Sequence, residues 1–269
     1  MSISVHPTAI VSDGAEIGEG SEIGPYSVIG EFVRLGRSNK VGPHVVLEGH
    51  THIGDSNQIF QFASVGSQPQ DLKFKGEPSV LEVGDNNIIR EYVTLQPGTE
   101  HGLMKTTIGS KNLFMACSHI GHDSIVGNSN IFANGVAVSG HVEIENGVIL
   151  GGLAGIHQFV KLGDLAFIGA GAMVAQDIPP FCMSQGDRAT LIGLNEIGMK
   201  RAGHDEQEVH QLRKVFRAAF NGEGTFKSRV ESLIEQYADS ATAQQFLTFL
   251  SQSKRGVAQP RKSSKRASQ

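Results

Sequence analysis

Residues 5–65 of this 269-residue chain read VHPTAIVSDGAEIGEGSEIGPYSVIGEFVRLGRSNKVGPHVVLEGHTHIGDSNQIFQFASV. An aliphatic residue stands at every sixth position from Val5 to Val65, eleven in succession, and glycine follows it in seven of those eleven places. The fifth position of each hexad is mostly small, β-branched or Asn. A phase that holds over eleven repeats predicts a solenoid in which each hexad forms one short strand and one turn. Three hexads close a triangular coil, with the aliphatic side chain inside and glycine favoured at the turn.

The repeat continues through most of the chain. It returns at Val83, Ile89 and Leu95 and then runs unbroken from Ile108 to Val174. Insertions near residues 66–79 and 99–107 interrupt it, and loops expelled from a solenoid often carry function. Hexapeptide repeats wind left-handed, against the usual rule for crossovers. We therefore expect an all-β left-handed parallel β-helix over residues 1–186.

The C-terminal third has a different pattern. After about residue 205 apolar residues recur at helical spacing, at Val209, Leu212, Val215, Phe216, Ala219 and Phe220. This predicts a small α-helical domain over residues 187–252, which caps the open end of the solenoid. The last 16 residues hold six basic and no acidic side chains. Residues 253–269 are therefore predicted to be a disordered tail, either solubilising or a weak electrostatic arm.

Charge and cysteine content narrow the functional classes. The net charge of -4 falls to -10 without the tail, with 17 basic against 27 acidic residues, which argues against a nucleic-acid partner. The two cysteines, Cys117 and Cys182, form no CxxC motif and fit a reducing compartment. With no signal peptide and no apolar stretch approaching 18 residues, we expect a cytoplasmic protein without a membrane-spanning segment.

Histidines gather on one face of the predicted solenoid. Because residues 18 apart stack directly, three successive coils carry His122, His141 and His157, and Gly140 lies one coil above His122. His119 falls at the preceding corner. A histidine can act as a general base near neutral pH, an adjacent Asp123 can orient its ring, and the Gly140 amide can bind an oxyanion. These are the parts that acyl transfer requires.

Other interpretations of the same residues remain open at this point. The histidines can be solvated turn residues of a pure scaffold, or zinc ligands of a carbonic-anhydrase-like hydratase, which takes three of them. Asp123, Gln158 and Gly140 suit an organic substrate better than a closed metal shell. We therefore expect neither a metal nor a cofactor.

Six segments carry a family resemblance: HPTAIV (6–11), QDLKFKGEPS (70–79), HIGHDSIVGN (119–128), SGHVEI (139–144), GIHQFVKLG (155–163) and AQDIPP (175–180). Together they resemble the UDP-N-acetylglucosamine acyltransferases of lipid A synthesis, over about residues 5–220. The resemblance implies a homotrimer with active sites between neighbouring β-helices. It also implies transfer of an (R)-3-hydroxyacyl chain from acyl carrier protein to the 3-hydroxyl of UDP-N-acetylglucosamine, the first step of lipid A biosynthesis.

The resemblance also assigns roles. His122 is similar to the family's general base, with Asp123 supporting it, and the Gly140 N–H to the oxyanion donor. Ala170 matches the residue that closes the acyl groove and acts as a ruler of chain length. Substrate contacts are implied for Asp71, Lys73, His119, His141, His157, Gln158, Asn195 and Arg201. No metal, cofactor or covalent acyl-enzyme is implied.

The chain departs from the family pattern in three places. Residues 96–99 read QPGT where many members read HRGT, which leaves open an alternative acceptor, a 3-amino UDP-sugar that would give an amide. Ala202 stands where a second arginine is common, and the acidic Glu196 is shifted next to Asn195 and receives no role. A sibling N-acyltransferase of the same pathway has an extra domain before its hexads. Because the hexads here begin at Val5, we expect the O-acyltransferase.

Overall fold

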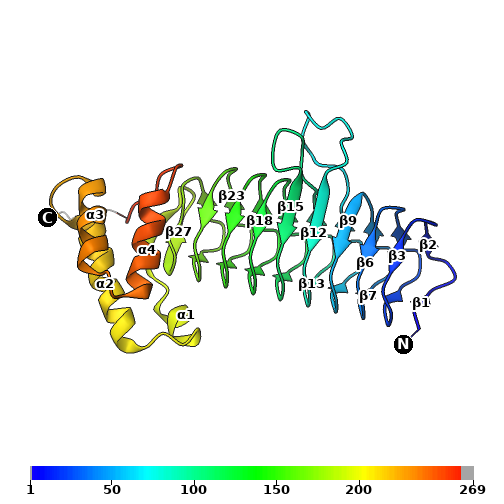
Figure 1. Ribbon diagram of the computed structural model, residues 1–269, viewed down its shortest axis with the longest axis horizontal. Coiled ribbons are helices and arrows are strands. Elements are labelled where there is room, and N and C mark those ends of the chain that lie inside the picture. The colour runs from blue at the N-terminus through cyan, green and yellow to red at the C-terminus, as the bar shows by residue number, and fades with distance from the viewer. Residues whose placement is uncertain (1, 262–269) are drawn as a thin grey trace, which may run out of the picture.

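The computed structural model describes residues 2–261, which form a long β-helix closed at one end by helices (Figure 1). Each coil gives one strand to each of three sheets, and paired strands are parallel with partners 18 residues apart where no insertion intervenes, as in Ser4↔Glu22. The predicted fold class, a left-handed parallel β-helix with a helical C-terminal region, is confirmed.

The three sheets run the length of the solenoid. Sheet A comprises β1 (Ser4–Val5), β4 (Glu22–Ile23), β7 (Lys40–Val41), β10 (Gln58–Ile59), β13 (Ile88–Ile89), β16 (Leu113–Phe114), β19 (Ile131–Phe132), β22 (Ile149–Leu150), β25 (Phe167–Ile168), β27 (Cys182–Gln185) and β28 (Thr190–Leu194). Sheet B comprises β2 (Ile10–Val11), β5 (Val28–Ile29), β8 (Val46–Leu47), β11 (Ser64–Val65), β14 (Thr94–Leu95), β17 (His119–Ile120), β20 (Ala137–Val138), β23 (Gly155–Ile156) and β26 (Met173–Val174). Sheet C comprises β3 (Glu16–Ile17), β6 (Arg34–Leu35), β9 (His50–Ile53), β12 (Val80–Val83), β15 (Lys105–Ile108), β18 (Ile125–Val126), β21 (Glu143–Ile144) and β24 (Lys161–Leu162).

The core is a stack of layers, as the hexads predict. From Ile23 to Val174 the aliphatic position of each hexad is buried. The fifth position is buried as well, and between sheets C and A it carries a ladder of asparagines in which Asn57 Nδ2 donates to Asn39 Oδ1 at 3.0 Å and Asn87 Nδ2 to Asn57 Oδ1 at 3.0 Å. From Asn39 to Asn87, the buried asparagine of each coil therefore accepts a hydrogen bond from the asparagine of the next coil.

The corners need an unusual backbone conformation. Among the described residues, 17 that are not glycine have a positive φ, and those in the solenoid stand three places after the buried aliphatic residue or at comparable turn positions. Side chains at these positions stack from coil to coil, as Tyr26, His44 and Phe62 do with ring centroids 5.1 Å apart. Stacking offsets part of the cost of the left-handed conformation.

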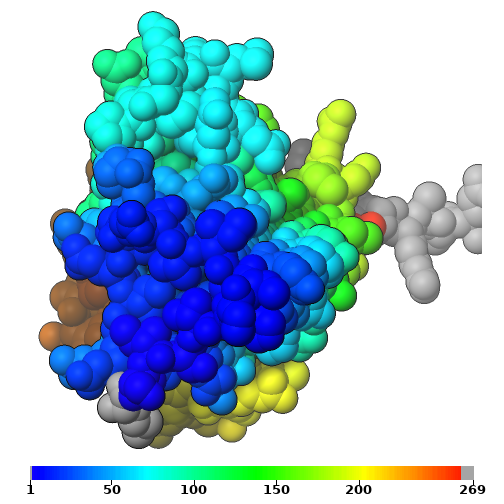
Figure 2. Space-filling model, turned by 90° about the vertical axis from the view of Figure 1, so that its right-hand side faces the viewer, coloured from blue at the N-terminus to red at the C-terminus, as the bar shows by residue number. Residues whose placement is uncertain are grey.

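The two insertions leave the solenoid side by side, at the edge where β12 and β15 begin (Figure 1). Figure 2, seen from the N-terminal end, shows them standing above the coils, the first in cyan and the second in blue-green. They are joined, because the Glu77 carboxylate accepts the Glu100 N–H at 2.9 Å and the Val80 N–H bonds to the Met104 carbonyl at 2.9 Å. The second insertion ends earlier than the predicted residue 107, since Lys105 onward pairs with β12 as part of β15.

Four helices follow the solenoid: α1 (Glu196–Arg201), α2 (Glu206–Asn221), α3 (Phe226–Gln236) and α4 (Ala241–Gln252). The helical region predicted from residue 187 thus begins later, because Thr190–Leu194 pairs antiparallel with β27 as strand β28. Asp205 starts α2 with a capping box, and buried apolar residues such as Leu212 and Phe246 join the helices to the core. Over the described residues, no helix has the length and apolar character needed to cross a bilayer.

The prediction of a disordered tail is wrong for residues 253–261. Val257 is 5% exposed and Ala258 1% exposed, and residues 257 and 260 form β-bridges to Asp177 and Leu191. The prediction of disorder came from the six basic residues of the tail. The segment is nevertheless held in place because Val257 and Ala258 are buried. Residues 262–269, the rest of the predicted tail, lie outside the described residues.

Candidate active site

We use the name histidine corner for the turns between sheets B and C on three successive coils, residues 121–124, 139–142 and 157–160. His122 follows strand β17 and is half-buried, and Asp123 next to it is buried with φ of 59°. In this conformation the two adjacent side chains meet, with His122 Nδ1 2.8 Å from Asp123 Oδ2. The pairing expected from the sequence is therefore present.

The second insertion closes over the Asp123 carboxylate. Its Oδ1 accepts the backbone N–H groups of Thr99 at 3.0 Å and Leu103 at 2.7 Å, and its Oδ2 accepts the Thr99 hydroxyl at 2.6 Å. Gly102 must be glycine for this approach, because a Cβ there would overlap the carboxylate. Burial by itself raises the pKa of Asp123, but the bonds from Thr99, His122 and Leu103 together hold it below its ordinary value. Asp123 is thus an ionised carboxylate with fixed orientation.

This carboxylate determines which nitrogen of His122 is free. An acceptor at Nδ1 favours the neutral tautomer with its proton on Nδ1, which leaves the lone pair on Nε2. Nε2 lies against the next coil, where a Cβ added to Gly140 would be only 2.7 Å away. Gly140 therefore makes room for the ring, and His122 Nε2 is placed to accept a proton.

The Gly140 amide is itself available. At the corner between sheets C and A the equivalent amides are capped by side chains of the next coil, as when Asn146 Oδ1 accepts the Asn128 N–H at 2.9 Å. Within residues 2–261 we find no hydrogen-bond acceptor for the N–H of Gly140. An uncapped amide beside a base is what an oxyanion site needs.

Two further histidines adjoin the pair. The His141 ring meets His122 edge-on at 5.1 Å and stacks on Phe159 at 4.6 Å. The pKa of His141 is lowered, mainly because burial disfavours the charged ring, although the carboxylates of Asp123 and Asp71 oppose this effect. Burial and then the charge of His122 lower the pKa of His119. His119 lies on the face of sheet B, within β17, rather than at a corner as predicted.

The first insertion contributes the two predicted contacts Asp71 and Lys73. The Asp71 carboxylate acts electrostatically on His141, so this loop comes close to the histidine corner. Asp71 Oδ1 also accepts the backbone N–H of Lys73 at 3.0 Å, and the Lys73 side chain is exposed.

One coil beyond Gly140 lie His157 and Gln158, both exposed. His157 lines a groove of about 690 Å³ along sheet B, together with Ser139 and Gln176. Its Nδ1 is 2.8 Å from Nη2 of Arg255, in the segment predicted to be a tail. The basic composition of this segment predicted a disordered tail, so the contact between Arg255 and His157 was not expected from the sequence.

Three predicted residues lie elsewhere on the chain. Asn195 caps α1, where its Oδ1 accepts the Gly198 N–H at 3.0 Å and its Nδ2 donates to the Leu165 carbonyl at 2.8 Å. Asn195 lines a groove of about 740 Å³ beside sheet A together with the exposed Arg201. Ala170 is exposed at the corner that follows β25, between sheets A and B. A single chain thus does not bring these residues to His122.

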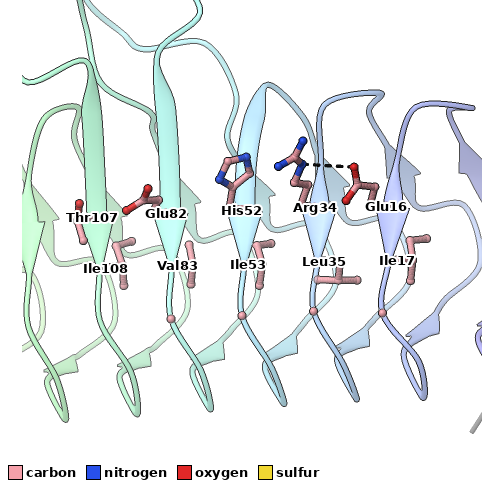
Figure 3. Close-up of a pocket in the computed structure, with 14 residues that line it drawn as sticks. Glu16, Ile17, Arg34, Leu35, His52, Ile53, Glu82, Val83, Thr107 and Ile108 are labelled. Atoms are coloured by element: carbon pink, nitrogen blue, oxygen red, sulfur yellow. Dashed lines mark ion pairs between the residues drawn. The ribbon is translucent and has the colours of Figure 1, made fainter.

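A different groove, of about 760 Å³, lies on sheet C near the N-terminal end (Figure 3). The outward side chains there form a row across neighbouring strands, in which Arg34 pairs with Glu16 at 3.5 Å. No predicted site residue is among its lining residues. The groove is the polar outer face of the sheet.

Donor atoms that can hold a metal ion meet at one place in the described residues. His122, Asp123 and His141 each offer an atom within 4.8 Å of the others. Both Asp123 oxygens already accept hydrogen bonds from the protein, and one of them holds His122 Nδ1. A metal would have to break these bonds, so the donors fit a carboxylate–histidine pair better than a zinc site.

The residues missed from the sequence are Thr99, Gly102 and Leu103 in the second insertion and Arg255 after the last helix. The signal for the first three was the insertion itself, since it interrupts the repeat just before the histidine hexads. A glycine within so short a loop also indicates close approach of the backbone to another group.

Comparison with known proteins adds an independent line of evidence. A family model described as UDP N-acetylglucosamine O-acyltransferase, domain 2, matches residues 177–258, and one described as bacterial transferase hexapeptide matches residues 14–49. The acyl-[acyl-carrier-protein]–UDP-N-acetylglucosamine O-acyltransferase of Anaeromyxobacter dehalogenans is 47% identical over 255 residues, 95% of this chain and 99% of the relative. The protein of the same name from Thiobacillus denitrificans is 45% identical over 94% of this chain and 98% of the relative.

Solved structures agree with these matches. The crystal structure of UDP-N-acetylglucosamine O-acyltransferase from Moraxella catarrhalis superposes with a TM-score of 0.92 at 37% identity, covering 95% of this chain and 99% of that one. The likeness therefore extends over nearly the whole chain. The chain belongs to the acyl-[acyl-carrier-protein]–UDP-N-acetylglucosamine O-acyltransferase family.

Proposed function

We propose that this enzyme transfers an (R)-3-hydroxyacyl chain from acyl carrier protein to the 3-hydroxyl of UDP-N-acetylglucosamine, the first step of lipid A biosynthesis. The observation that carries the proposal is the histidine corner, where a carboxylate-bound His122 lies against an uncapped Gly140 amide. A base and an oxyanion donor on adjacent coils are the minimum equipment for acyl transfer.

The reaction follows from this geometry. His122 Nε2 removes the proton of the acceptor hydroxyl, and the oxygen attacks the thioester carbonyl. The negative charge that develops on the carbonyl oxygen is stabilised by the Gly140 N–H, while Asp123 stabilises the imidazolium formed on His122. When the intermediate collapses, the C–S bond breaks and the proton on His122 passes to the leaving thiolate. The products are the ester and the free thiol of the carrier protein, so atoms and charges balance.

Substrate contacts come from the surroundings of the same corner. Asp71, Lys73, His119, His141 and Gln158 are the polar groups assigned to the substrate on the chain that supplies His122. His119 and His141 have lowered pKa values, so both are neutral near pH 7 and can donate or accept hydrogen bonds. Neutral rings suit contact with sugar hydroxyls.

The remaining residues support a homotrimer. Asn195 and Arg201 beside sheet A, and Ala170 at the corner between sheets A and B, lie on other sides of the triangular solenoid from His122. One active site that uses all of them must take the second group from a neighbouring subunit. The acceptor's nucleotide and phosphates are then held by Asn195 and Arg201, and the acyl chain ends near Ala170.

We place this assembly in the cytoplasm, in line with the absence of CxxC motifs and paired cysteines.

The main alternative function differs from the proposed one only in the acceptor, which would be a 3-amino UDP-sugar. Curated relatives are named O-acyltransferases, which favours the hydroxyl over a 3-amino sugar despite the sequence Gln96-Pro97. The decisive experiment supplies purified enzyme with acyl carrier protein thioester and equal amounts of the 3-hydroxy and 3-amino UDP-sugars. We expect the ester as main product. Amide as the main product would reverse the acceptor assignment, and no transfer to either sugar would reject the function. Metal analysis of the same sample tests the zinc alternative, which requires bound metal at one ion per site.

A further inference from the structure

The segment that follows the last helix reaches the histidine corner. Arg255 Nε donates to the Ala175 carbonyl at 2.7 Å, and Nη2 lies 2.8 Å from His157 Nδ1. The segment is anchored on either side, because the Ser253 hydroxyl donates to the buried Asp177 at 2.6 Å and Val257 bridges to the same residue. The guanidinium is therefore fixed between the Ala175 carbonyl and the His157 ring.

This contact dictates the tautomer of His157. A guanidinium has five N–H donors and no acceptor, so the nitrogen that it meets must present a lone pair. The Gln158 carbonyl is 3.2 Å from the same Nδ1 and would require a proton there instead. The two contacts exclude each other, and the shorter one, from a charged donor, is the stronger. The Arg255 contact therefore favours the tautomer of His157 with the ring proton on Nε2.

We propose that Arg255 is a positioning residue that holds His157 as a hydrogen-bond donor to the substrate. His157 lines the groove along sheet B with Ser139 and Gln176. Arg255 lines a separate hollow of about 520 Å³ with Phe159 and Lys161. Arg255 is not among the residues that line the groove, and with Nδ1 engaged by its guanidinium, Nε2–H is the group left for an acceptor oxygen of the ligand. The nature of that ligand rests on the proposed function, but the tautomer does not.

The tautomer is directly measurable. Full-length enzyme labelled with ¹⁵N-histidine gives ring ¹⁵N–¹H correlations that distinguish the two neutral forms, and His157→Gln identifies the signals of His157. We expect the Nε2–H pattern in the wild type and its loss in Arg255→Met. A wild-type spectrum with the proton on Nδ1, or an unchanged pattern in Arg255→Met, overturns the proposal. Because no turnover is involved, this result stands apart from the identity of the reaction.

Kinetics then test whether Arg255 acts through His157. Arg255→Met should lower kcat/KM about tenfold, the size expected for a hydrogen bond to a charged group. In a His157→Gln background the same change should have less than a twofold effect, because its target is gone. Equal losses in both backgrounds would show that Arg255 works independently and would contradict the proposal.

Matched variants separate charge and folding from positioning. Lys254→Met removes a neighbouring positive charge on the same segment and should leave kcat/KM within twofold. Arg255→Lys keeps the charge, but a single ammonium cannot reach both the Ala175 carbonyl and His157 in the fork geometry of arginine. It should therefore lose the Nε2–H signature while keeping the fold. If Arg255→Met does not fold, the spectrum of Arg255→Lys decides the question in its place.

Discussion

The Thr99 hydroxyl lies 2.6 Å from Oδ2 of Asp123, the same oxygen that holds the His122 ring at 2.8 Å. Through this one atom, a loop that interrupts the solenoid is connected to the base of the reaction. The loop is in turn joined to the first insertion through Glu77, which accepts the Glu100 N–H. The two insertions and the histidine corner thus form one hydrogen-bonded unit.

Thr99→Val should weaken this unit without removing it. The variant loses one of the bonds that lower the Asp123 pKa, so kcat should fall about tenfold, the size of a hydrogen bond to a charged group. A depressed carboxylate pKa stabilises the fold above the unfolded value near 3.9, and the contribution disappears as pH falls through the folded pKa. Urea unfolding should therefore show a wild-type advantage at pH 6 that shrinks below about pH 4.

Thr106→Val is the matched control for this change. Thr106 is buried in the adjacent strand β15, and its hydroxyl has no hydrogen-bond partner among the described residues. Removing it should leave both kcat and stability near wild type or slightly improved. Equal effects of the two substitutions would mean that the Thr99 hydroxyl has no special relation to Asp123.

His122→Ala should abolish turnover while the protein stays folded, because the ring is at a corner and outside the layered core. A general base contributes about 10²–10⁴-fold in rate. The control is His210→Ala, an exposed histidine on α2 that should stay close to wild type. Steady-state kinetics check both, and a His122 variant within about threefold of wild type in kcat/KM would reject the base assignment.

Gly140→Ala tests the other half of the site. The added Cβ would lie 2.6 Å from His122 Cε1 and 2.7 Å from Nε2, so the ring must move although the backbone amide remains. Displacing a catalytic group by about 1 Å can cost about 10²-fold in rate, and we expect a loss of that order in kcat. Gly152→Ala, whose Cβ would have no neighbour closer than 3.4 Å, controls for the effect of a methyl group on folding. Similar kcat values for wild type and Gly140→Ala would exclude close packing of base and amide.

Much of the fold could be predicted because the repeat period of six residues determines which residues stack on one another. A period of six with three strands per coil places residue 140 over residue 122, and the structure agrees, since the Gly140 position abuts the His122 ring. Local pattern could not show where the non-repeating parts pack. Asn195 was expected only from family resemblance, and the structure adds a helix cap in which its Oδ1 and Nδ2 each make one hydrogen bond. The contact of Arg255 was missed because the six basic residues predicted a disordered tail, whereas the buried Val257 and Ala258 hold the segment against the solenoid.

His141 makes stability depend on pH in the direction opposite to a histidine whose pKa is raised in the folded state. Burial lowers its pKa in the folded state, so below about pH 6.5 the unfolded chain binds a proton that the folded chain does not. Stability is therefore lost as pH falls from about 6.5 toward the lower folded pKa. The variant His141→Gln should lose less stability than wild type between pH 7.5 and 5.5 in urea unfolding. An equal loss in both proteins would show that His141 does not contribute.

Ala170 should set the length of the acyl chain if the groove between subunits ends at its corner. Its side chain is exposed, and it stands one coil above Gly152. Each buried CH₂ contributes about 0.8 kcal/mol, roughly a fourfold step in affinity per carbon, until the tail meets the closing residue. Beyond that point overpacking costs about 1–3 kcal/mol, so selectivity falls sharply for longer chains.

Since alanine adds one methyl group to glycine, the groove should end only slightly earlier than with glycine, and we expect a preference for 3-hydroxyacyl chains of about 12 to 14 carbons. Donor profiles of wild type, Ala170→Met and Ala170→Gly test this directly. Methionine should move the optimum to donors shorter by several carbons, because its side chain occupies the end of the groove, and glycine should move it slightly longer. If Ala170→Met folds normally and keeps the wild-type optimum, the end of the groove lies at another residue, and Ala170 is small only because the coil corner demands it.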